Sequence, residues 1–280
     1  MRICHIAGSV MFGACVLWGS VSPAAIIHRY SFNGNSVNDS VGNADGTLVN
    51  GAKVVGGQLI FDPKVNNGSN TDITTGQYVS FPSNLLHVRS FSIETWATFG
   101  GGGNWQRILD FGNSIPNPSP PPVGNIGHGF IILTPSNGAG GVTGQISINS
   151  WGDPSDTDLA YGPPVSTNVE HQIVYTHDPV AGFDRLFVDG AQVGVSTARV
   201  DPSTANYSNF WLGRSQFTQD PFYKGSIDEL RIYDNSLSAG TIAGDYAVGP
   251  NVLPEPSALS LLAGSAWMLT SRRRRVTGQR

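Results

Sequence analysis

Three oxygen-bearing side chains lie close together in one glycine-containing stretch of the chain: Asp39, Asn43 and Asp45. Carboxylate, amide and main-chain oxygens are the ligands that Ca²⁺ prefers in proteins. The same residue types are common in turns without any metal, where their side chains hydrogen-bond the backbone. The spacing therefore predicts either a structural calcium site or a tight turn, and both interpretations stay open at this point.

A second group of residues has the composition of a carbohydrate-binding surface, in which sugars stack their apolar faces on Trp or Tyr and carboxylates flank the rings. These residues lie in two aperiodic stretches that we expect to be loops, and they are Trp105, Trp151, Asp153, Asp156, Asp158 and Tyr161. We predict ligand binding by Trp105, Trp151, Asp153, Asp156 and Tyr161. The alternative is that Trp151 covers one end of the hydrophobic core.

The sequence lacks the patterns of the common hydrolytic mechanisms. A glycosidase needs two carboxylates about 5–9.5 Å apart. One strand can supply both acids in the pattern Glu-x-Asp-x-x-Glu, and this sequence contains no such run. Asp228 and Glu229 are adjacent, so a regular strand would place them on opposite faces. Neither a Gly-x-Ser-x-Gly motif nor a His-x-x-x-His pair is present. We therefore predict a protein that is not an enzyme, with a polysaccharide hydrolase or lyase as the less favoured alternative.

The charge of the central region restricts its partners. Residues 26–250 hold 10 Lys and Arg against 19 Asp and Glu, a net charge of −9. An acidic surface repels phosphate backbones, so the sequence predicts no nucleic-acid partner. Both cysteines, Cys4 and Cys15, precede this region. No disulfide can therefore stabilise residues 26–250, which must rely on their hydrophobic core.

The N-terminus has the pattern of a secretory signal peptide. Residues 1–25 combine a basic start at Arg2, an apolar run and the small residues Ala24 and Ala25 as a cleavage point. The apolar run is short for a membrane span. The sequence therefore predicts export.

The C-terminus carries a second targeting pattern in residues 251–280. Pro254-Glu255-Pro256 precedes an apolar stretch at 258–270, and four arginines follow at 272–275. This order resembles the PEP-CTERM sorting signal of Gram-negative bacteria. The resemblance implies transient membrane anchoring through residues 258–270, processing by an exosortase, and delivery to the cell surface or extracellular matrix.

Between these ends the chain reads as short strands separated by turns. The 35 glycines, the 18 prolines and the small charged fraction favour strands and tight turns over helices. Apolar alternation predicts strands at 28–32, 77–81, 91–96, 107–111, 130–133, 144–149, 171–176, 184–188, 191–195, 210–213 and 226–233. The proline-rich stretch 112–127 is expected to be a long loop, and 238–246 a short helix capped by Ser238. We predict an all-β, two-sheet antiparallel sandwich or jelly roll in one domain, residues 26–250.

Seven short stretches, in order, resemble the LamG-like jelly-roll family of the concanavalin A-like lectin/glucanase fold. They are Tyr30–Asn35, Asp39–Leu48, Phe91–Trp96, His171–Thr176, Leu186–Gly190, Leu212–Arg214 and Gly225–Tyr233. The resemblance covers about residues 26–247 and implies the fold far more strongly than any function, because this fold hosts lectins, hydrolases, lyases and adhesion modules. It also implies that a structural Ca²⁺ would join the Asp39, Asn43 and Asp45 loop to Asp228.

Together these patterns predict an exported, non-catalytic binding module for a polysaccharide or cell-surface glycan, with Ca²⁺ as structural support. A structural matrix protein without a specific ligand is the main alternative. The strand parity around Trp96 leaves one structural question open. Trp96 lies opposite Phe91 and Ile93, so either both faces of this strand are covered or a bulge intervenes.

Overall fold

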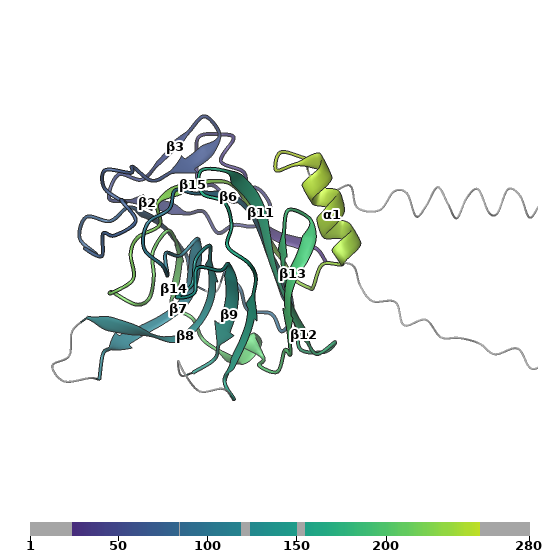
Figure 1. Ribbon diagram of the computed structural model, residues 1–280. Coiled ribbons are helices and arrows are strands. Elements are labelled where there is room, and N and C mark those ends of the chain that lie inside the picture. Colours follow the sequence, from purple (N-terminus) through teal and green to yellow (C-terminus); the bar gives the residue numbers. More distant parts are fainter. Residues whose placement is uncertain (1–23, 84, 119–123, 150–154, 253–280) are drawn as a thin grey trace, which may run out of the picture.

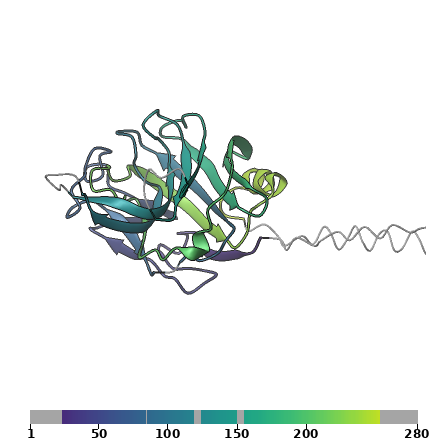
Figure 2. The same ribbon diagram turned by 90° about the horizontal axis from the view of Figure 1, so that it is seen from below.

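The computed structural model describes residues 24–83, 85–118, 124–149 and 155–252. Two antiparallel sheets pack face to face and enclose the hydrophobic core, with one short helix outside them (Figures 1 and 2). The all-β, two-sheet sandwich predicted from the sequence is confirmed.

Sheet A has eight strands and sheet B has seven. The path of sheet A is β13 (Ala191–Ser196), β12 (Phe183–Val188), β11 (Glu170–Asp178), β6 (Phe91–Phe99), β15 (Gly225–Tyr233), β4 (Gln58–Ile60) and β3 (Lys53–Val55), and β1 (Ile26–Tyr30) pairs with β15. The path of sheet B is β10 (Thr157–Tyr161), β9 (Thr143–Ser147), β8 (Asn125–Thr134), β7 (Leu109–Pro116), β14 (Asn209–Leu212), β5 (Tyr78–Phe81) and β2 (Thr47–Val49). A short 3₁₀ turn, η1 (Pro202–Thr204), precedes β14.

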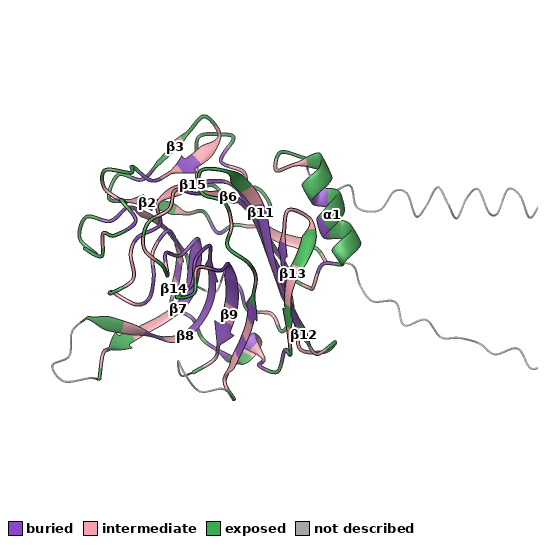
Figure 3. Ribbon diagram, viewed as in Figure 1, coloured by how far each residue is buried: buried purple, intermediate pink, exposed green. Residues whose placement is uncertain are grey.

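Both faces of the central strand β6 are covered, which explains the parity around Trp96. Phe91 and Ile93 point into the core between the sheets. Glu94 and Trp96 belong to the other face and are buried as well. The helix α1 (Ala239–Val248) lies on this outer side of sheet A (Figure 3). A bulge is also present. It lies on the neighbouring strand β15, where the register shifts between Ile227 and Glu229 next to Trp96.

Helix α1 begins where the sequence predicts it. Ser238 has an extended backbone, and its hydroxyl accepts a hydrogen bond from the amide of Thr241 at 3.1 Å. Such a cap satisfies one of the amides that the first turn leaves free. Ile242 is fully buried and belongs to a small cluster with Val174 and Phe187 on the outer face of sheet A. The helix therefore closes a second, smaller core.

Most of the described residues of the stretch 112–127, predicted to be a long loop, are instead strand: 112–116 belong to β7 and 125–127 to β8. Strands β7 and β8 continue as a two-stranded ribbon that pairs Pro116 with Asn125 and extends away from the sandwich (Figure 1). Its outer residues Ile115, Pro116 and Asn125 are exposed, so the end of the ribbon needs no apolar alternation. Proline is tolerated because a ribbon edge has no second neighbour that needs its amide.

Four other strands were not predicted. β2, β3 and β4 have three residues each, which is too short for an alternating pattern to stand out. β10 lies in the stretch predicted to be a loop, and the buried residues of this strand include Asp158 beside Ala160. A buried aspartate interrupts the apolar alternation by which a strand is recognised.

The two terminal signals lie almost entirely outside the described residues, so the interpretations of residues 1–25 and 251–280 stay predictions. Within the described part of the chain, no helix is long and apolar enough to cross a membrane.

Candidate functional site

Trp105 and Tyr161, two of the residues predicted to bind a ligand, line one surface hollow. Trp105 lies in the connection between β6 and β7, and Tyr161 is the last residue of β10. The hollow has a volume of about 400 Å³. Between the two aromatic residues its lining consists of Asn137, Ala139, Pro164 and three glycines. None of these side chains carries a charge. The hollow therefore suits a neutral ligand with both an apolar face and polar groups.

Trp105 is held in an uncommon backbone conformation. Its φ angle is 65°, in the left-handed region, which costs a bulky residue about 1–3 kcal/mol. Three contacts fix it there: its amide donates to Ser136 O at 2.7 Å, its carbonyl accepts from Arg107 Nη1, and the Arg107 guanidinium lies 5.5 Å from the centre of the indole ring. Strained residues of this kind gather at functional sites.

Tyr161 is the most exposed aromatic residue at the hollow. Its side chain is 56% exposed, and it follows two buried residues of the edge strand β10 at Asp158 and Ala160. An exposed tyrosine presents both an apolar ring face and a hydroxyl to solvent. Asn137 shapes the opposite wall, because its side-chain oxygen accepts the amides of Ala139 and Gly141. These bonds fix the shape of the loop between β8 and β9, which the amide of Trp105 contacts at Ser136 O.

A smaller hollow of about 170 Å³ adjoins Trp105, and its lining includes Phe217 and the charged residues Arg107 and Asp220. The Arg107 guanidinium lies between the Trp105 and Phe217 rings, 5.5 Å and 5.8 Å from their centres. It also donates to Asp220 Oδ2 at 2.7 Å and contacts Asp110 Oδ2 at 3.3 Å. The indole is therefore supported from behind by a cation that two carboxylates hold in place.

Asp110 and Asp220 are the nearest approach to a catalytic pair of acids at this site, and sequence reasoning did not find them. Burial raises the pKa of Asp110 to about 7, although the nearby Arg107 lowers it in part. Burial likewise raises the pKa of Asp220. Asp110, however, is fully buried and accepts the amide of Gln216. A proton donor must reach its substrate, so this arrangement supports Arg107 better than it supports catalysis.

Of the other residues predicted to bind a ligand, Asp156 is the one that the structure describes, and it does not line the hollow. Trp151 and Asp153 lie outside the described residues. Asp156 lies next to Thr157, where β10 begins, and Tyr161 ends the same strand; a strand of this length places them roughly 16 Å apart. Asp158 points into the core and is almost completely buried. The expectation that residues 157–161 form a loop is therefore wrong, because they form strand β10. Ligand binding by Trp151, Asp153 and Asp156 stays a prediction.

The loop predicted to bind Ca²⁺ is organised around Asp39. Its two carboxylate oxygens accept five hydrogen bonds, from the amides of Arg29, Val41, Gly42 and Ala44 and from His28 Nδ1 at 2.6 Å. Asp45 accepts the amide of Asp39 at 2.8 Å, and Asn43 is exposed. These bonds are those of a tight turn, the alternative interpretation of the spacing. Calcium binding by Asp39, Asn43 and Asp45 stays a prediction.

Asp228 has neighbours of its own. Its Oδ2 accepts a hydrogen bond from Gln58 Nε2 at 3.0 Å, and the nearby carboxylate of Glu170 has a pKa that burial and Asp228 raise. No hydrogen bond within the described residues joins Asp228 to Asp39, Asn43 or Asp45. The following residue, Glu229, is the one that connects to the first strand, through Arg29 Nε at 2.6 Å.

Replacing Asp39 by asparagine should lower the free energy of unfolding by about 2–3 kcal/mol at neutral pH. The side-chain nitrogen of asparagine cannot accept the hydrogen bonds that backbone N–H groups now donate to the carboxylate. Burial alone would raise the pKa of Asp39, but His28 and the amides of Arg29, Gly42 and Val41 lower it to about 2. Its contribution is therefore present above the unfolded-state pKa of about 3.9 and is lost as the pH falls toward 2. Urea unfolding at pH 7, 4 and 2.5 measures this, and an equal loss at all three values would contradict it.

One further group was missed because its members are far apart in the sequence. Asp158, His177 and Asp184 are all buried, and one ligand atom of each lies within 4.8 Å of the others. The sequence could have indicated this group only by the presence of an aspartate or a histidine at strand positions that face the core. These side chains lie between the two sheets, away from any ligand that stays on the surface.

Comparison with known proteins agrees with this fold. The sequence model described as the concanavalin A-like lectin/glucanases superfamily matches residues 73–243. No curated protein matches the chain by sequence. Many solved structures share the fold.

Three solved structures illustrate the similarity that was found. Domain 4 of AbnA, a GH43 extracellular arabinanase from Geobacillus stearothermophilus solved with arabinotriose, is 20% identical with a TM-score of 0.57, covering 80% of this chain and 98% of that domain. The binding domain of botulinum neurotoxin DC, solved with rat synaptotagmin II, is 14% identical with a TM-score of 0.54, covering 80% and 51%. The Ruminococcus gnavus IT-sialidase CBM40, solved with α2,3-sialyllactose, is 17% identical with a TM-score of 0.45, covering 56% and 82%.

Proposed function

Because the chain belongs to the concanavalin A-like lectin/glucanases superfamily, we propose that it is a non-catalytic module that binds a neutral polysaccharide or cell-surface glycan through the hollow between Trp105 and Tyr161. The observation that carries this proposal is the strained, half-buried Trp105 facing an exposed tyrosine across a lining without charged side chains. Two aromatic residues so placed can hold the apolar faces of sugar rings.

The preference for a neutral glycan rests on charge. No charged side chain lines the hollow, and residues 26–250 carry a net charge of −9. A polyanion would meet repulsion without a local cation to compensate, because Arg107 is occupied by Asp220 and Asp110. The arabinotriose held by domain 4 of AbnA is itself an uncharged oligosaccharide, and we include arabinan among the candidate ligands for that reason.

Affinity electrophoresis of the purified protein through gels that contain one polysaccharide each tests the proposal. We expect retardation by at least one neutral polymer among arabinan, xylan, mannan and mixed-linkage glucan, and none by alginate or polygalacturonate. The same polymer should release no new reducing ends during prolonged incubation. Retardation by the anionic polymers alone would contradict the proposal, and new reducing ends would favour a hydrolase. Unretarded but folded protein in every gel would favour a structural matrix protein.

A further inference from the structure

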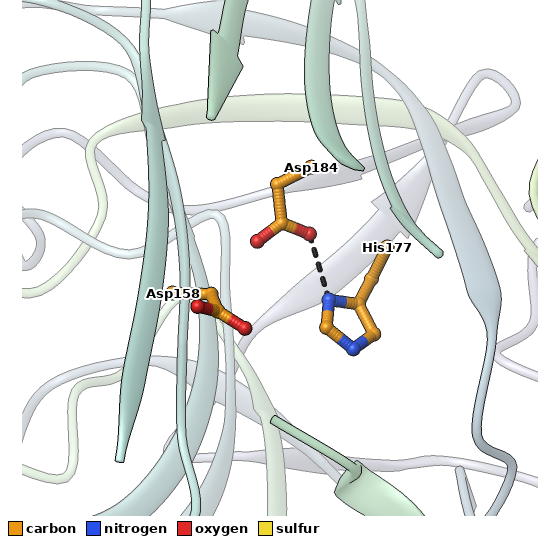
Figure 4. Close-up of side chains that lie close together, drawn as sticks. All are labelled: Asp158, His177 and Asp184. Carbon is orange, nitrogen blue, oxygen red and sulfur yellow. Dashed lines mark hydrogen bonds and ion pairs between the residues drawn. The ribbon is translucent and has the colours of Figure 1, made fainter. Parts of the chain in front are cut away.

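A polar cluster lies between the two sheets, on the far side of β10 from the surface. Asp158 comes from β10 of sheet B, and His177 and Asp184 are cross-strand partners on β11 and β12 of sheet A. The three side chains are at most 1% exposed. Figure 4 shows them pointing toward one another across the gap between the sheets. Such a cluster costs free energy unless its charges are compensated.

The hydrogen bonds of His177 fix which of its nitrogens carries the hydrogen. Nε2 lies 3.0 Å from the carbonyl oxygen of Val200. A carbonyl can only accept, so Nε2 must donate. In the neutral imidazole, Nδ1 then has a lone pair, and it faces Asp184 Oδ1 at 2.7 Å. Two lone pairs this close need a cation or a proton between them.

Other atoms of the cluster have unused bonding capacity. Asp184 Oδ2 and the Tyr175 hydroxyl are both buried, and neither makes a hydrogen bond of good geometry. The Tyr175 hydroxyl is close enough to lower the pKa of the Asp184 carboxyl, which burial raises more strongly. Asp158 uses Oδ2 to accept the amides of Arg199 and Val200. Its Oδ1 has only a 3.4 Å contact with Arg199 Nε, on a side chain that is 60% exposed. Oxygen donors from both sheets are thus available to a common ligand.

This cluster lacks the buried guanidinium that accompanies Glu94, Glu229 and Asp110. Glu94 and Glu229 share the buried guanidinium of Arg231, and Asp110 contacts Arg107. The two aspartates of the cluster have no buried lysine or arginine among the described residues, only a histidine. Burial accordingly raises the pKa of Asp184, so a proton is the competing occupant of this space.

We propose that Asp158, His177 and Asp184 bind one divalent transition-metal ion, Zn²⁺ or Mn²⁺, which joins sheet B to sheet A. One imidazole with two carboxylates suits these ions better than Ca²⁺, which is rarely bound by histidine. The second nitrogen of a metal-bound histidine commonly donates to a backbone carbonyl, as Nε2 does here to Val200. Binding displaces the proton that His177 and Asp184 otherwise share. The site is independent of the Trp105 hollow and does not rest on the proposed function.

Metal content and thermal unfolding of the whole protein test the proposal. After treatment with a chelator and dialysis, the protein is titrated with Zn²⁺, Mn²⁺, Ca²⁺ or Mg²⁺. We expect one Zn²⁺ or Mn²⁺ per chain by elemental analysis, and a rise in Tm of about 5–10 °C at a hundredfold excess over the Kd. Ca²⁺ and Mg²⁺ should give a much smaller rise.

Variants locate the ion. Asp184→Asn should abolish both the stoichiometric binding and the rise in Tm. His171→Asn is the matched control, because His171 Nδ1 also lies 2.7 Å from a carboxylate, that of Asp189, without a third ligand. It should leave the metal response unchanged. If Asp184→Asn does not fold, the metal content of the unaltered protein and the change of its Tm with added metal still test the proposal.

Two results would overturn the proposal. The first is an unaltered protein that holds less than about a tenth of an equivalent of either ion and whose Tm no ion raises, in which case a proton alone occupies the cluster. The second is a folded Asp184→Asn variant that binds the ion as tightly as the unaltered protein.

Discussion

Replacing Arg231 by methionine should lower the free energy of unfolding by about 3–5 kcal/mol, because breaking a buried ion network leaves uncompensated charges in the protein interior. Arg231 is fully buried. Its Nε donates to Glu229 at 2.7 Å, its Nη1 donates to Glu94 at 3.3 Å, and its Nη2 donates to the carbonyl oxygens of Pro250 and Val252. Methionine fills similar space and satisfies none of these four acceptors.

The two carboxylates would respond differently to the loss. Glu229 keeps Arg29 at 2.6 Å. Glu94 would keep only the neutral donors Tyr233 and Gln172, each at 2.7 Å. Burial already raises the pKa of Glu94 to about 7 with Arg231 present, and removing the guanidinium raises this pKa further. A second change, Glu94→Gln in the Arg231→Met background, should therefore restore part of the lost stability.

Thermal and urea unfolding measure both effects. For a domain of this size the expected loss corresponds to a fall in Tm of about 6–20 °C. Arg89→Met is the control, because Arg89 pairs with Asp201 at the surface, where its side chain is 58% exposed. That change should alter stability by no more than about 0.5 kcal/mol. If the two arginine changes lowered the free energy of unfolding equally, the buried network would not be what holds Pro250 and Val252 against sheet A.

Replacing Trp105 by alanine should weaken binding of the retained glycan about 10- to 100-fold. Covering a large aromatic side chain is worth about 1.5–3 kcal/mol, and each 1.4 kcal/mol is tenfold in Kd. Stability should change little, because Trp105 is only half-buried and alanine meets a similar backbone strain at a φ of 65°. The loss of affinity would therefore report on the site and not on folding.

Tyr161 and Tyr246 provide a matched pair for the same experiment. Their side chains are 56% and 46% exposed, but Tyr161 lines the hollow and Tyr246 lies on helix α1. Tyr161→Ala should weaken glycan binding, and Tyr246→Ala should not. If both tyrosine variants, or neither of them, lost affinity while Trp105→Ala bound normally, the ligand would lie elsewhere on the protein.

The sequence was sufficient for the sandwich because its longer strands are rich in β-branched and aromatic residues and are separated by turn residues. β6, β11 and β15 have nine residues each and form the middle of sheet A. Residue type predicted the cap at Ser238, and the Asp189-Gly190 turn lies between the predicted strands that became β12 and β13. Alternation failed where strands are short, as in β2, or where a core position holds a polar residue, as Asp158 does in β10.

The candidate site was predictable only in part. Trp105 and Tyr161 were identified by residue type, since exposed aromatic residues near carboxylates suggest a sugar. Their meeting at one hollow depends on the loop at Asn137 and on the path of β10, which are tertiary features. The pairing of His177 with Asp184 depends on strand register, and the approach of Asp158 depends on how the sheets pack. None of these leaves a local pattern in the sequence.

The most direct test of the central claim is the indole N–H signal of Trp105 in the ¹H–¹⁵N spectrum of the labelled protein during titration with neutral oligosaccharides, arabinotriose among them. If the hollow binds a neutral glycan, this signal moves saturably with one of them. The indole signals of Trp96, which is buried, and of Trp211, which lies under Arg214 at 4.1 Å, stay in place. A Trp105 signal that no neutral oligosaccharide moves at millimolar concentration, or movement confined to the other tryptophans, would contradict the account.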